Sequence, residues 1–129
     1  MIRVVDASVV LAVCHQEQGS DIARESMRRG LISTVNLSEV YEKAIEYGRL
    51  PIAEAIVQTA ALEVVEFDEL HALEAAKFAE QARKKGISFA DRACLALGVC
   101  EQLPVVTADR SWTELDLGIK IELFRDGTD

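Results

Sequence analysis

Four acidic side chains stand where predicted strands give way to helices: Asp6, Glu39, Asp91 and Asp109. Asp6 and Asp109 directly follow short apolar stretches, and Glu39 lies in the first turn after another. Carboxylates that gather in a partly desolvated cleft repel one another unless a cation neutralises them, and a set of oxygen ligands suits Mg²⁺ or Mn²⁺. The residues therefore predict a divalent metal site.

The elements that must position these acids follow from the apolar pattern of the chain. Short β-branched stretches predict strands at residues 2–5, 31–35, 62–67, 104–107 and 119–124. Amphipathic or apolar stretches predict helices at residues 7–17, 20–29, 36–48, 51–60, 68–85 and 88–100. This alternation indicates one α/β domain over residues 1–129, with a mainly parallel five-stranded sheet and helices on both faces. Ligands of such sheets bind beyond the carboxyl ends of the strands, where three of the four acids are expected.

Each acid also has an ordinary structural role at the start of a helix. Asp6 and Asp109 fit N-caps, while residues 36–39 and 88–91 both fit capping boxes. Asp91 is harder to explain as a cap alone, because its helix is apolar nearly all round and a buried acid needs a partner. Metal ligation and helix capping are therefore two interpretations of the same residues.

The overall composition limits the classes of function. The chain has 14 Lys and Arg against 22 Asp and Glu, a net charge of −8, which argues against a broad basic face for nucleic acid. Only 5% of residues are aromatic, so a platform of stacked rings for bases is not expected. The three cysteines lack zinc-ligand spacing and are expected to be reduced thiols. With neither a signal peptide nor a run of about 20 apolar residues, we expect a cytoplasmic protein that does not bind membranes.

Four motifs of the sequence resemble those of the PIN-domain ribonucleases, specifically the VapC-type toxins of bacterial and archaeal toxin–antitoxin pairs. They are VVDAS (4–8), STVNLSEV (33–40), SFADRACLAL (88–97) and PVVTADRSW (104–112). The resemblance covers nearly the whole chain. The acidic quartet of the family falls on Asp6, Glu39, Asp91 and Asp109, with no substitution, so the motifs indicate an active enzyme.

The resemblance implies a PIN fold and an endoribonuclease in which Mg²⁺ or Mn²⁺, held by the quartet, activates water for in-line attack on an RNA phosphodiester. It also implies a small antitoxin protein that blocks the site, and usually a toxin homodimer. Ser8 and Thr107 would hydrogen-bond a carboxylate or a metal-bound water, with local capping as the alternative. Arg92 and Arg110 would contact flanking RNA phosphates, with solvated or surface-paired arginines as the alternative.

Two other classes of function have a similar pattern of elements. A phosphoacceptor receiver domain has this size and an acidic pocket, but it needs a pair of acids after the first strand and a lysine after the last. Here Asp6 is followed by Ala7 and Ser8, and Lys120 precedes its strand. An interaction module would keep the acids only as helix caps, in which case a metal titration would detect no specific site.

Overall fold

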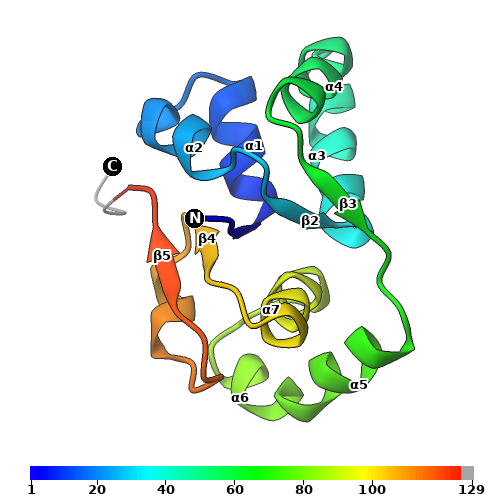
Figure 1. The fold of residues 1–129 in the computed structure, drawn as a ribbon, viewed down its shortest axis with the longest axis vertical. Helices are drawn as coiled ribbons and strands as arrows, with labels where there is room; N and C mark the ends of the chain where they lie inside the picture. Colours follow the sequence, from blue (N-terminus) through cyan, green and yellow to red (C-terminus); the bar gives the residue numbers. More distant parts are fainter. Residues whose placement is uncertain (126–129) are drawn as a thin grey trace.

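The computed structural model describes residues 1–125 (Figure 1). The strands are β1 (Val4–Val5), β2 (Leu31–Ser33), β3 (Glu63–Val65), β4 (Val105–Thr107) and β5 (Ile121–Leu123). The α-helices are α1 (Ala7–Cys14), α2 (Ser20–Ser26), α3 (Thr34–Glu46), α4 (Leu50–Thr59), α5 (Glu69–Lys77), α6 (Ala79–Lys84) and α7 (Phe89–Glu101), and a short 3₁₀ helix, η1, spans Arg110–Glu114. Within this part of the chain, no helix is long and apolar enough to cross a bilayer.

The five strands form one sheet in the order β3-β2-β1-β4-β5, and every pairing is parallel. The predicted α/β class and five-stranded sheet are therefore confirmed. The order of the chain reverses between β1 and β4, which is where sheets of this kind bind ligands. Receiver domains have the order 2-1-3-4-5, so the receiver alternative is wrong.

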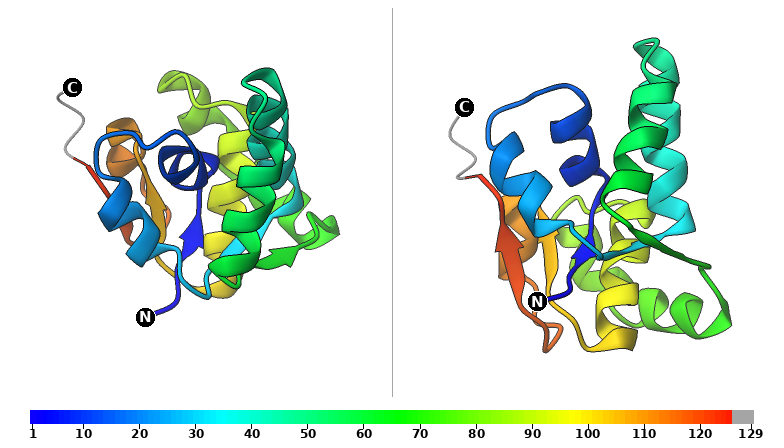
Figure 2. Two further views of the ribbon diagram at one scale, coloured as in Figure 1. Left: turned by 90° about the horizontal axis from the view of Figure 1, so that it is seen from above. Right: turned by 45° about the horizontal axis from the view of Figure 1, so that its top comes forward.

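Helices cover both faces of the sheet, as predicted (Figures 1 and 2). Successive strand residues point to opposite faces. Val5 and Val106 join a core with α1, α2, α3 and α4, whereas Val4 and Val105 join a second core with α6, α7 and Trp112 of η1. These two cores hold the strand ends, and with them the acids, in fixed positions.

The predicted helix over residues 68–85 is wrong in one respect, because it is broken into α5 and α6. Phe78 separates the two helices, with φ −110° and ψ 21°. Its side chain is buried in the second core together with Ala82. Tertiary packing at Phe78 thus overrides the helix propensity of an alanine-rich stretch.

The predicted N-cap at Asn36 is also wrong. Helix α3 begins at Thr34, directly after β2, and its N-cap is Ser33, whose hydroxyl accepts a hydrogen bond from the Val35 amide at 3.2 Å. Ser33 ends the strand and caps the helix at once, so no separate loop is needed. Asn36 consequently lies inside the helix and is fully buried.

Candidate functional site

The four predicted acids lie at the carboxyl edge of the sheet. Asp6 follows β1 and Asp109 follows β4, two strands that are paired. Glu39 lies in α3, which begins where β2 ends, and Asp91 lies in the first turn of α7. The negative charges of Glu39 and Asp91 both raise the pKa of Asp6, so the structure brings these side chains within electrostatic reach of one another.

Asp6 is the most buried of the four, with 6% of its surface exposed. As the predicted N-cap of α1, its Oδ1 accepts a hydrogen bond from the Ala7 amide at 2.8 Å. Burial raises the pKa of Asp6 from 3.8 to about 6, and hydrogen bonds from Ser8 and Thr107 oppose this rise. The site therefore holds a desolvated carboxyl group with an unusually high proton affinity.

The hydroxyls of Ser8 and Thr107 connect Asp6 to the end of β4. Each donates a hydrogen bond of 2.8 Å to Oδ2 of Asp6. The Ser8 hydroxyl accepts from the Ala108 amide, and the Thr107 hydroxyl accepts from the Asp109 amide, both at 3.1 Å. These bonds hold Asp6 in one orientation and join the two strand ends that carry acids.

Asn36 connects the helices that carry Glu39 and Asp91, a contact that sequence analysis missed. Its Nδ2 donates to Oε1 of Glu39 at 3.1 Å and to the carbonyl of Ala90 in α7 at 2.9 Å. The Oδ1 atom is buried and has no hydrogen-bond partner within residues 1–125. The signal in the sequence was the spacing of three residues between Asn36 and Glu39, which places the two side chains on one helix face.

Glu39 is partly buried, and this burial raises its pKa. The hydrogen bond from Asn36 lowers this pKa, while the negative charges of Asp91 and Glu42 raise it. Glu42 is a fifth acid near the cluster that sequence analysis did not single out. Its spacing of one helical turn from Glu39 was the available signal.

Asp91 is both a cap and a member of the cluster. The predicted capping box is confirmed: the Asp91 amide donates to the Ser88 hydroxyl at 3.2 Å, and Oδ2 of Asp91 accepts from the Ser88 amide at 3.1 Å. Burial nevertheless raises the pKa of Asp91, and the charge of Asp109 raises it further. The box uses one carboxylate oxygen of Asp91.

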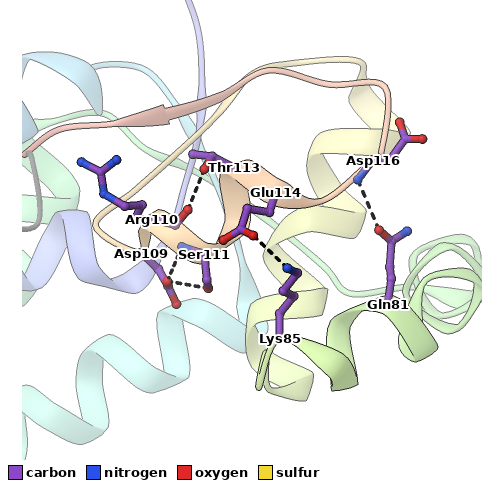
Figure 3. Close-up of polar contacts among 8 residues, drawn as sticks. All are labelled: Gln81, Lys85, Asp109, Arg110, Ser111, Thr113, Glu114 and Asp116. Carbon is purple, nitrogen blue, oxygen red and sulfur yellow. Dashed lines mark hydrogen bonds and ion pairs between the residues drawn. The ribbon is translucent and has the colours of Figure 1, made fainter.

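Asp109 is exposed and caps η1, as predicted, through Oδ1, which accepts from the Ser111 amide at 2.9 Å and hydroxyl at 2.7 Å. Two contacts fasten the segment that follows to α6 (Figure 3). Lys85 forms an ion pair of 2.8 Å with Glu114, and the Asp116 amide donates to Oε1 of Gln81 at 3.2 Å. These contacts limit the movement of the chain beyond Asp109.

The two arginines that follow acids differ in their surroundings. Nη1 of Arg92 donates to the Ala75 carbonyl of α5 at 3.0 Å, and its guanidinium carbon lies 5.6 Å from the centre of the Phe89 ring. Arg92 thus connects α7 to α5. Arg110 is exposed, and its guanidinium points away from the Asp109 carboxylate (Figure 3). Contacts of either arginine with RNA stay predictions.

Comparison with protein families matches residues 3–117 to the PIN domain. Comparison with curated protein sequences finds no match. Among solved structures, DNA-bound VapBC from Salmonella typhimurium is 20% identical with a TM-score of 0.72, over 97% of this chain and 100% of that chain. VapBC2 from Rickettsia felis, bound to a promoter DNA fragment, is 14% identical with a TM-score of 0.73, over 95% and 98%. VapBC-5 from Mycobacterium tuberculosis is 21% identical with a TM-score of 0.65, over 97% and 98%.

Identities at this level show a shared fold, and the family model gives the stronger result because it matches most of the chain. The parallel sheet and the acids at its carboxyl edge agree with that match. This chain belongs to the PIN domain family.

Proposed function

We propose that this chain is a VapC-type toxin, a metal-dependent endoribonuclease that an antitoxin protein restrains. The observation that carries the proposal is the buried Asp6 carboxyl group, with its pKa raised to about 6, beside Glu39 and Asp91 at the carboxyl edge of a PIN fold. The similar solved structures are described as VapBC toxin–antitoxin complexes, which supports an antitoxin partner. A homodimer and an RNA substrate belong to the same proposal.

The donor set of the cluster fits Mg²⁺ or Mn²⁺. As the side chains stand, no three His, Cys, Asp or Glu residues within residues 1–125 are close enough to share one ion. Mg²⁺, however, usually keeps several waters and is held by only one or two carboxylates, so three direct ligands are not required. A desolvated carboxylate among like charges is also the group that a cation would stabilise most. Asp6, Glu39, Asp91 and Asp109 would hold the ion, directly or through its waters.

When bound, the ion would lower the pKa of a coordinated water and neutralise charge on the phosphate. The protein's own groups supply the positioning. The Ser8 and Thr107 hydroxyls fix Oδ2 of Asp6, and Asn36 fixes Oε1 of Glu39. Arg110 extends from the segment after Asp109 and is proposed to contact a flanking RNA phosphate.

The second candidate is an interaction module in which the acids serve only as helix caps. Asp6, Asp91 and Asp109 do accept capping hydrogen bonds. A helix N-terminus, however, stabilises the charged form of an acid and so lowers its pKa. Burial and neighbouring acids instead raise the pKa of Asp6 and of Asp91, which favours the nuclease.

The proposed function is tested by cleavage of a labelled single-stranded RNA. We expect cleavage with Mg²⁺ or Mn²⁺, none in excess EDTA, and recovery when metal is added back. Asp6→Asn should lower the rate by about 100-fold or more, because several kcal/mol of transition-state stabilisation would be lost. The matched control is Asp21→Asn, at an exposed acid of α2, which should leave the rate unchanged. Undiminished cleavage in excess chelator, or by Asp6→Asn, would contradict the proposal.

The raised pKa of Asp6 predicts how the stability of the metal-free protein depends on pH. Because the folded-state pKa of about 6 exceeds the usual 3.8, the stability gained from protonating Asp6 is complete below about pH 4 and is lost as the pH rises through about 6. This shift corresponds to roughly 3 kcal/mol. Denaturant unfolding in EDTA from pH 4 to 7.5 should therefore show Asp6→Asn becoming more stable relative to the parent as the pH rises. A constant difference between the two proteins would mean that Asp6 has no raised pKa.

Asn36 provides a test of positioning. Asn36→Ala removes the hydrogen bond that orients Glu39, and loss of such a partner typically weakens metal binding by about 10- to 100-fold. We expect the Mn²⁺ concentration for half-maximal cleavage to rise by that factor, while the rate at saturating Mn²⁺ changes little. Ser38→Ala, at an exposed position of the same helix, is the control. An unchanged Mn²⁺ requirement in Asn36→Ala would refute the positioning role.

A further inference from the structure

We propose that Phe89 forms a stacking site for one unpaired RNA base beside the acidic cluster. This inference rests on the proposed nuclease function. It adds the kind of nucleotide that the site selects: a base in a single strand or a loop, with a free face.

Phe89 is the exposed phenylalanine of the described chain. It is the first residue of α7, two positions before Asp91, and 52% of its surface is accessible to solvent. Phe78 and Phe124 are 5% and 2% exposed, and Phe67 is partly buried. Burial would stabilise such a large apolar side chain, so its exposure at the start of a helix that carries a cluster acid indicates a contact surface.

The Phe89 ring is held in one orientation although it is exposed. Phe67 packs against it with ring centres 5.5 Å apart and planes at 73°. The Arg92 guanidinium lies over the ring at 5.6 Å and is itself fixed by its hydrogen bond to the Ala75 carbonyl. The amide of Phe67 donates to the hydroxyl of Thr34 at 3.2 Å. A ring that is already immobilised loses little conformational entropy when a base stacks on it.

These contacts place the ring at the same edge of the sheet as the acids. Phe67 follows β3, Thr34 begins α3, and Phe89 begins α7, which lies between α3 and α5 (Figure 1). The hydrogen bond from Asn36 to the Ala90 carbonyl connects the first turn of α7 to the helix that carries Glu39. An RNA strand with its phosphate at the acids would therefore have a neighbouring nucleotide within reach of Phe89.

The charge of the protein explains why such a contact is needed. RNA binding usually depends on Lys and Arg that neutralise phosphates, whereas this chain has a net charge of −8 and an acidic cluster at the site. Stacking on an aromatic ring is independent of charge, and Arg planes also stack on bases. The low aromatic content correctly argues against an extended platform, but a single exposed ring needs no such content. In a duplex the faces of a base are covered, so this site favours unpaired nucleotides.

The test is steady-state cleavage of a single-stranded RNA oligonucleotide in Mn²⁺ by the parent, Phe89→Leu and Phe89→Tyr. Phe89→Leu should raise KM by roughly 10-fold with little change in kcat, and Phe89→Tyr should behave as the parent, because stacking survives in Tyr. Tyr47→Leu is the control, since Tyr47 is 66% exposed at the opposite end of α3 from Thr34. Thermal melts with and without Mn²⁺ establish that each variant is folded and binds metal.

A series of substrates with one abasic nucleotide tests the same site without altering the protein. With the parent, one position should show a similar rise in KM, and Phe89→Leu should add nothing further at that position. If the parent cleaves RNA but Phe89→Leu keeps its KM, the stacking site is wrong while the nuclease stands. If the parent neither binds nor cleaves RNA, both fail. An altered elution volume of Phe89→Leu with an unchanged KM would assign the ring to a protein contact and overturn the proposal.

Discussion

Desolvation of the Asp6 carboxyl group is the constraint on which the site depends. A carboxylate with 6% exposure beside two other acids is unfavourable in the charged form, and this is why the pKa of Asp6 rises to about 6. A proton or a cation can remove the penalty. Two hydroxyl groups and one amide already donate to this carboxyl group, so the fold holds it in place rather than letting it turn toward water.

The parallel sheet and its crossover helices explain how acids far apart in sequence meet. All strands end at one edge, so β1 and β4 deliver Asp6 and Asp109 to adjacent positions. Helices α3 and α7 bring the other two acids, and Asn36 holds these helices together through the Ala90 carbonyl. Capping and clustering do not exclude each other here. A helix that begins at the carboxyl edge takes an acid as its cap, and the same acid then faces its neighbours.

Much of this arrangement could be predicted from the sequence, because it depends on local pattern. Asp6 and Asp109 directly follow apolar strands, and the Ser88–Asp91 box has a recognisable spacing. The role of Asn36 could not be predicted, since it depends on β2 ending at Ser33 and on the approach of α7. The break at Phe78 also comes from tertiary packing. Composition reports how many aromatic residues there are, but not that Phe89 is exposed beside an acid.

The central claim is that the acids form one metal site, and calorimetric titration of RNA-free protein with Mn²⁺ at pH 7.5 tests it most directly. The account predicts specific binding by the parent, binding weakened by at least about 10-fold in Asp6→Asn and in Asp91→Asn, and parent-like binding in Asp21→Asn. Absence of specific binding by the parent would contradict the claim. Equal affinity in the parent and in both cluster variants would also contradict it, because the ion would then lie elsewhere.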